Sequence, residues 1–146
     1  MAFQSEPDTI RWKLHCNSAP QKVFDALATD EGRASFWAES ATETNNFITF
    51  TILGYEPYRS RIVKRTPPTQ FCIEYFGTTV DFRLKESDNF GTDLTMLATN
   101  VNDSIRMEMT AGWISVLMAM KAYVDHGVDL RNHDITRNWS AGFVDN

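Results

Sequence analysis

The sequence lacks several features that would assign a function directly. No apolar run approaches the roughly 18 residues that a membrane-spanning helix needs. The N-terminal residues MAFQSEPD contain no basic segment followed by an apolar one, so we expect no signal peptide and a cytoplasmic location. No Lys/Arg cluster stands out, and the formal net charge is −5. Because a nucleic-acid surface needs cations to neutralise phosphates, we expect no nucleic-acid partner.

Cysteine and histidine are scarce, and so are the motifs of known catalytic chemistry. The two cysteines, Cys16 and Cys72, each lie in a predicted strand among apolar neighbours. This placement indicates buried free thiols in a reducing compartment rather than a disulfide or a nucleophile. The three histidines share no metal-ligand spacing, and no G-x-S-x-G, H-E-x-x-H or phosphate-binding glycine loop occurs. The sequence therefore predicts no catalytic residue, no metal site and no cofactor.

The longest periodic pattern is helical and covers residues 103–127. Asp103 or Ser104 can cap its start, and Gly127 follows its last periodic residue as a C-terminal glycine does. At 100° per residue one face of this helix is apolar along its whole length. That face consists of Met109, Trp113, Val116, Leu117, Met120 and Val124. A stripe this long requires a sheet to pack against.

The remaining pattern is one strand, two short helices and then strand after strand. Residues 9–16 alternate as a half-buried strand, Pro20 opens a short helix to Ala28, and a second short helix runs to Trp37. Further strands are predicted at residues 46–53, 57–65, 70–76, 78–85 and 92–101. This order predicts an α+β fold with a curved antiparallel sheet of about six strands wrapped round the long C-terminal helix. The 146 residues fit a single domain with a core at about 9–127 and a tail at 128–146.

Three stretches carry a resemblance to a known family. They are APQKVFDAL at residues 19–27, GRASFW at residues 32–37 and GWISVLMAMK at residues 112–121. With the order of elements, they make the chain similar to the START-like or SRPBCC superfamily, whose helix-grip fold is that of the birch-pollen allergen. The nearest branch resembles activators of the heat-shock-protein-90 ATPase. That branch has no shared catalytic residue set, so the resemblance implies a fold rather than an activity.

The helix-grip fold implies an apolar space between the sheet and the C-terminal helix. Large aromatic side chains on the inward faces of the strands can either fill such a space or line it as a ligand cavity. We expect a cavity, because Trp12, Tyr58 and Tyr75 each carry a polar atom suited to a pocket wall. The candidate ligand-binding residues are Trp12, Trp37, Phe50, Tyr58, Tyr75, Phe82, Met109, Trp113 and Met120.

Two classes of function fit this expectation. The first is a non-enzymatic domain that binds a small apolar or aromatic molecule, with a stress-related role among the physiological options. The second is an enzyme such as an aromatase/cyclase acting on a hydrophobic substrate, for which the inward polar side chains would be Tyr58, Ser60, Lys64 and Tyr75. A co-chaperone of a heat-shock ATPase is a third reading. We favour binding without catalysis. The chain is expected to be a monomer or a homodimer.

Charged residues of the strands are expected to face water. Glu74 and Asp81 alternate with inward apolar residues, and Arg59, Arg61 and Arg83 share the same outward parity. The pattern predicts a lattice of cross-strand ion pairs with little energetic consequence.

The polar tail contains two side chains that are too apolar for solvent, Trp139 and Phe143. A second stripe on the long helix, formed by Met107, Ile114 and Met118, would otherwise be uncovered. We therefore expect the tail either to fold back on the domain or to dock on a second copy.

Overall fold

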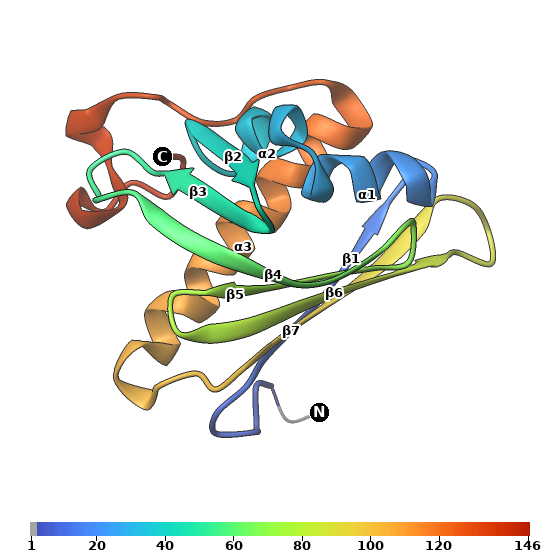
Figure 1. Ribbon diagram of the computed structural model, residues 1–146, viewed down its shortest axis with the longest axis horizontal. Coiled ribbons are helices and arrows are strands. Elements are labelled where there is room, and N and C mark those ends of the chain that lie inside the picture. The colour runs from blue at the N-terminus through green and yellow to red at the C-terminus, as the bar shows by residue number, and fades with distance from the viewer. Residues whose placement is uncertain (1–2) are drawn as a thin grey trace.

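The computed structural model describes residues 3–146. It consists of a seven-stranded antiparallel sheet with three helices on one of its faces (Figure 1). The strand order is β1-β7-β6-β5-β4-β3-β2. The strands are β1 (Ile10–Cys16), β2 (Ser40–Thr44), β3 (Phe47–Thr51), β4 (Tyr58–Thr66), β5 (Gln70–Tyr75), β6 (Thr78–Glu86) and β7 (Thr92–Thr99). The helices are α1 (Pro20–Ala28), α2 (Asp30–Phe36) and α3 (Asp103–His126), followed by short 3₁₀ turns η1 (Ile135–Arg137) and η2 (Trp139–Ala141). This is the expected helix-grip fold.

Strand β2 was missed by the sequence pattern, which is why the sheet has seven strands instead of about six. Its residues, SATET, have no apolar alternation. The strand forms a hairpin with β3 through Asn45 and Asn46, which both adopt positive φ angles of 51° and 64°. An Asn pair in this conformation is typical of a two-residue hairpin turn. The turn was the signal that could have revealed the strand.

Helices α1 and α2 form a V because the chain turns between them without a linker. The hydroxyl of Thr29 accepts a hydrogen bond from the Gly32 N–H at 3.0 Å and caps α2. Any side chain at position 32 would clash, since a Cβ there would lie 2.5 Å from the Ala26 carbonyl oxygen. The fully buried Arg33 then donates to the carbonyl oxygens of Leu27 and Ala41, which fixes α2 against the start of β2.

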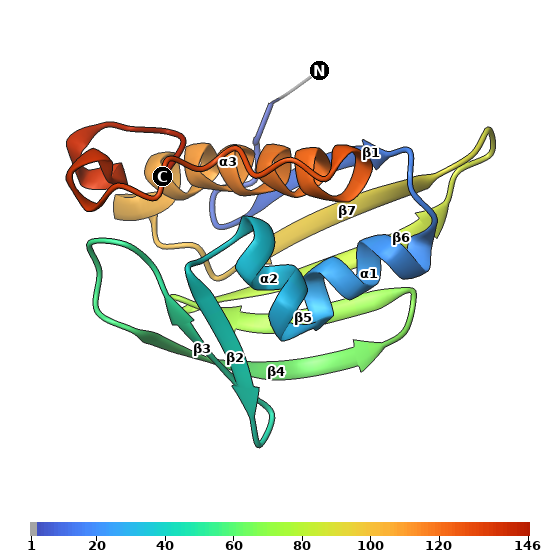
Figure 2. The same ribbon diagram turned by 90° about the horizontal axis from the view of Figure 1, so that it is seen from above.

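Helix α3 begins and ends close to its predicted bounds. The N-cap is Asn102, one residue before the predicted Asp103 or Ser104, and its side chain accepts from the Ser104 N–H at 2.9 Å. Gly127 ends the helix in the left-handed conformation, with φ of 65°. Figure 2 shows α3 lying alongside β1, with both short helices beside it. No helix within residues 3–146 has the length and apolar character that crossing a bilayer demands.

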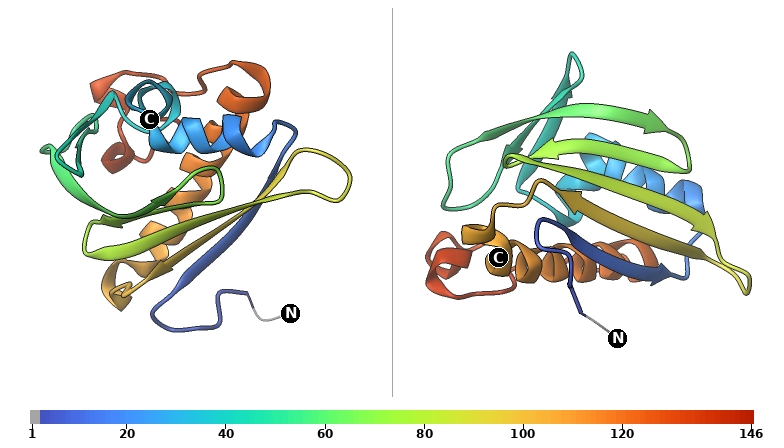
Figure 3. Two further views of the ribbon diagram at one scale, coloured as in Figure 1. Left: turned by 45° about the vertical axis from the view of Figure 1, so that its right-hand side comes forward. Right: turned by 90° about the horizontal axis from the view of Figure 1, so that it is seen from below.

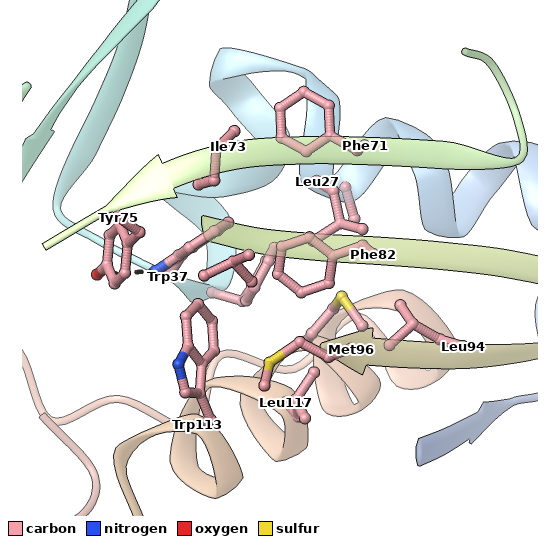
Figure 4. Close-up of a cluster of buried hydrophobic side chains, with 14 of the residues drawn as sticks. Leu27, Trp37, Phe71, Ile73, Tyr75, Phe82, Leu94, Met96, Trp113 and Leu117 are labelled. Atoms are coloured by element: carbon pink, nitrogen blue, oxygen red, sulfur yellow. Dashed lines mark hydrogen bonds between the residues drawn. The ribbon is translucent and has the colours of Figure 1, made fainter. Parts of the chain in front are cut away.

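An aromatic cluster occupies the space between the sheet and α3 (Figure 4). Trp37, directly after α2, is its centre and is only 5% exposed. Its ring centroid lies 4.9 Å from that of Phe50, 5.5 Å from Tyr75, 5.7 Å from Trp113 and 6.0 Å from Phe82. Such tilted and edge-to-face contacts add to the apolar burial. Side chains therefore fill the interior at this level.

Both cysteines are buried and free. Burial, with a smaller contribution from the Asp125 carboxylate, raises the pKa of the Cys16 thiol to about 11. Burial also raises the pKa of Cys72. The expectation of two unreactive thiols agrees with this placement.

The outer face of the sheet does not carry the expected ion-pair lattice. Arg83 does contact Asp81, with Nε 2.9 Å from the carboxylate. The Arg59 guanidinium instead lies over the Phe47 ring, 3.7 Å from its centroid. Within residues 3–146 Arg61 has no carboxylate within 4.0 Å, and Arg83 and Asp81 both belong to β6, so the prediction of a cross-strand lattice was wrong.

The tail, residues 128–146, folds back along α3, which is the first of the two expected arrangements (Figure 2). Its anchor is the buried guanidinium of Arg131, which donates to the carbonyl oxygens of Ala34 and Ala38, each at 2.7 Å. The tail covers the second apolar stripe of α3 only in part, because Ile114 and Met118 remain 45% and 49% exposed.

His133 forms the second anchor of the tail. Its two ring nitrogens lie 2.7 Å from the carboxylates of Glu39 and Asp129. The hydrogen bond to Asp129, and to a smaller extent that to Glu39, raises the pKa of His133 above its ordinary value of 6.5. A raised pKa in the folded state stabilises the fold below the unfolded pKa, and this contribution disappears as the pH rises through the folded pKa.

We therefore expect the free energy of unfolding to depend on pH through His133. The variant His133→Asn removes the titrating ring and tolerates the positive φ of 55° at this position. Urea unfolding should show a larger difference between wild type and variant at about pH 6 than at about pH 9. His126→Asn, at an exposed helix end, is the matched control. An equal difference at both pH values would contradict the linkage.

Candidate functional site

A groove of about 320 Å³ opens beside the aromatic cluster, at the N-terminal half of α3. We call it the α3 groove. One wall is α3 itself, another is the β5–β6 turn, and a third is the loop after β3. Its apolar lining includes Ile52, Tyr55, Tyr75, Phe76, Ile105, Met109, Trp113 and Val116. This size is near the lower end of the roughly 300–1,000 Å³ that small-molecule pockets span.

The floor of the groove is formed by Trp37 and Tyr75. The Trp37 indole N–H donates to the Tyr75 hydroxyl at 3.2 Å, as the dashed line in Figure 4 shows. Burial raises the pKa of the Tyr75 hydroxyl far above its usual value, so this group stays protonated. Within residues 3–146 the Tyr75 hydroxyl proton has no acceptor. The floor therefore presents one neutral hydrogen-bond donor inside an apolar wall.

The tail forms the roof of the groove. The Trp139 indole N–H donates to the Glu108 carboxylate at 2.9 Å, which holds the ring over the Gly112 turn of α3. Beside it, the Tyr55 and Ser140 hydroxyl oxygens lie 2.8 Å apart and join the loop after β3 to the tail. Two segments far apart in the sequence thus close one side of the same space.

Four of the nine predicted ligand-binding residues line this groove: Trp37, Tyr75, Met109 and Trp113. Phe50, Phe82 and Met120 are fully buried in the core instead, where they support the cluster. These three have no surface free for a ligand in this structure.

The other two candidates are Trp12, on the edge strand β1, and Tyr58, at the start of β4. Trp12 donates its indole N–H to the Thr110 carbonyl oxygen at 3.2 Å and packs against Phe3. Tyr58 is half-buried, stacks on Phe76 at 4.0 Å, and reaches the Glu74 carboxylate at 3.3 Å. Neither side chain belongs to the lining of the groove.

The polar side chains predicted to face inward do not all do so in the structure. A register shift between Ile62 and Lys64 places Lys64 opposite the outward Cys72, so Lys64 leaves the interior that the strand parity gave it. Ser60 does face inward and is fully buried, but the α3 groove does not include it. Tyr75 is the only one of the four inward polar candidates that lines the groove.

Sequence reasoning missed the loop and tail residues of the groove. Tyr55 lies in a loop between predicted strands, where strand parity predicts nothing. Phe76 was predicted as the last residue of the 70–76 strand, but β5 ends at Tyr75 and Phe76 lies in the following turn with a positive φ of 48°. The one available signal was Trp139, whose apolar ring in a polar tail already required a docking place.

Comparisons with known proteins bear on the fold. No family model and no curated protein matches the sequence. Solved structures do match. A protein of Staphylococcus saprophyticus is 21% identical with a TM-score of 0.74, covering 87% of this chain and 98% of its own. An Aha1 dimer from Colwellia psychrerythraea is 20% identical with a TM-score of 0.73, covering 82% and 97%.

A third match is DynU16, described as a putative protein in the dynemicin biosynthetic locus. It is 15% identical with a TM-score of 0.72, and the match covers 85% of this chain and 49% of that one. These likenesses show the fold alone. At such identities, neither the family branch nor the site residues follow from them.

The Trp37–Tyr75 hydrogen bond yields a stability prediction. Tyr75→Phe leaves the buried indole N–H of Trp37 without an acceptor, so we expect a loss of about 1–3 kcal/mol in the free energy of unfolding. Tyr58→Phe is the matched control, because this residue is only half-buried, and it should cost less than about 1 kcal/mol. Urea denaturation measures both. Equal losses of stability in the two variants would show that the hydrogen bond from Trp37 to Tyr75 adds nothing measurable to the free energy of unfolding.

Proposed function

We propose that this chain binds a small, neutral, apolar or aromatic molecule that carries a hydrogen-bond acceptor. The observation that carries the proposal is the unshared donor of Tyr75 on the floor of an apolar groove. Pockets for small molecules combine such apolar walls with a few polar groups that fix orientation. A carbonyl or ether oxygen would accept from Tyr75, while rings would stack against Trp113 and Trp139.

The charge of the groove supports a neutral ligand. Its only ionisable carboxylate side chain within residues 3–146 is Glu108, which the Trp139 indole already holds at the rim. No Lys, Arg or His side chain in that range lines it, so an anionic ligand would lose its hydration without gaining a cation. The resemblance to the superfamily of the birch-pollen allergen points in the same direction.

A cyclase-type enzyme acting on a hydrophobic substrate is the second candidate. The single hydrogen-bond donor of Tyr75 inside an apolar groove favours it. In that reading Tyr75 would donate its hydrogen bond to a substrate carbonyl and polarise it. Conversion of an unreduced polyketide mimic by the wild type, abolished in Tyr75→Phe, would identify the enzyme. Binding of the mimic without formation of any product would support the non-enzymatic binding function instead.

Binding can be tested with a neutral fluorescent apolar probe such as Nile red. Met109→Glu places a carboxylate on the groove wall and should weaken probe binding by about tenfold or more, because the charge would lose hydration on burial. Met107→Glu is the matched control, since this side chain lies on the same helix but is 87% exposed. Fluorescence titration measures both affinities, and circular dichroism checks that both variants fold.

Probe affinity that falls equally in the two variants would place the probe outside the groove. An unchanged affinity in Met109→Glu would also overturn the proposed site.

A further inference from the structure

The outer face of the sheet, turned away from the helices, is open to solvent. Figure 3, right, shows β4 to β7 in front of the helices, with no helix across them. The register places the outward side chains in rows across the strands, such as Lys13, Thr95, Arg83 and Gln70. We call this surface the outer face.

Positive charge is concentrated on the outer face. The cations come from three strands: Arg11 and Lys13 of β1, Arg83 and Lys85 of β6, and Arg59, Arg61 and Lys64 of β4. The pairs in β1 and β6 are at alternate positions, and the register shift in β4 brings Lys64 to the same face as Arg59 and Arg61. These are seven of the fourteen Lys and Arg residues of the chain, while three of its nineteen Asp and Glu residues share the face. The outer face therefore carries +4 and the rest of the chain −9, with histidine neutral.

Most of these cations are not paired within the molecule. Arg83 contacts Asp81, and Arg11 lies 4.0 Å from Glu6. Lys13, Lys85 and the β4 cations have no carboxylate within 4.0 Å in the described part of the chain. Like charges gathered on one sheet face do not stabilise a fold. Their clustering is explained better by an external partner than by folding.

A shallow hollow of about 750 Å³ is lined by three of these seven cations. Lys13, Arg83 and Lys85 surround it together with His15, whose Nδ1 lies 2.8 Å from the Asp93 carboxylate. Thr69, Gln70 and Thr95 supply neutral hydrogen-bonding groups along it. The hollow thus combines two unpaired lysines and Arg83 with neutral polar side chains in one concave surface.

We propose that the outer face binds an acidic segment of a partner polypeptide, independently of the α3 groove. Along a strand, side chains on one face repeat at roughly 6.6 Å, so alternate carboxylates of an extended acidic segment match cations spaced two residues apart, such as Arg83 and Lys85. Arg and Lys bind carboxylates through charge-assisted hydrogen bonds. The polar groups of the hollow can satisfy the backbone of the segment.

Other anionic partners fit less well. The hollow is lined by no Phe, Tyr or Trp among the described residues, and single-stranded nucleic acids are held largely by stacking on such rings. Among the described residues its apolar lining is Leu14, Leu84 and Leu94, which are half-buried or buried and so are not free to enter a membrane interface. The carboxylates of Asp81 and Asp93 interrupt the positive charge, which suits a few separate carboxylates better than a continuous phosphate chain.

The test is fluorescence anisotropy with a labelled octapeptide of alternating Glu and Ser. The variant Lys13→Gln/Lys85→Gln removes two unpaired cations and should weaken binding by about fivefold or more. Lys22→Gln/Arg137→Gln is the matched control, because it makes the same charge change away from the outer face and should weaken binding by less than about twofold.

A neutral octapeptide of Gln and Ser, a short oligothymidylate and phosphatidylserine vesicles are measured in parallel. Tighter binding of the oligothymidylate or the vesicles than of the acidic peptide overturns the proposal in favour of those partners. Absence of measurable peptide binding by the wild type, or equal weakening in the two double variants, overturns it as well. Nile red binding should remain unchanged in Lys13→Gln/Lys85→Gln, which separates this face from the α3 groove.

Discussion

The packing of Trp37 between the sheet and α3 is the interaction on which the rest of the structure depends. The side chain follows directly from the end of α2, and the V of α1 and α2 sets its position through Gly32 and Arg33. Its ring contacts aromatic residues of the sheet and of α3 at once, and its N–H is satisfied by Tyr75. Because this cluster fills the interior, the space left for a ligand is displaced to the end of the sheet.

That displacement explains why only four of the nine candidate residues line the groove. Strand and helix periodicity identifies which residues face inward, and it correctly placed Trp113, Tyr75 and Phe82 on the interior side. Periodicity cannot distinguish a residue that fills the core from one that borders an opening, because both face inward. Phe82 and Tyr75 illustrate the two outcomes on neighbouring strands.

The remaining errors arose where backbone irregularity changes the face of a residue. The register shift in β4 moved Lys64 outward, and the Asn45–Asn46 turn created a strand with no apolar pattern. The fold itself was predictable because it rests on long, regular elements such as α3. The outer face was invisible as a sequence cluster, since its cations are spread over three strands and meet only when the sheet forms.

The two proposed surfaces lie on opposite sides of the sheet and differ in physical character. The α3 groove is apolar with one neutral donor, so its affinity would come from burial and depend little on salt. The outer face is cationic and exposed, so its affinity would fall as ionic strength rises. On these two proposals, one chain would hold a small molecule on one side of the sheet while a polypeptide contacts the other.

The central claim is that the interior is closed by the Trp37 cluster and that a ligand enters only the α3 groove. Four tryptophans report on it, because each indole N–H gives a separate ¹H–¹⁵N signal in a uniformly labelled sample. Titration with Nile red should shift the indole signals of Trp113 and Trp139, which border the groove, and leave that of Trp12 in place. A shift of Trp12 alone, or no indole shift at saturation, would contradict the account.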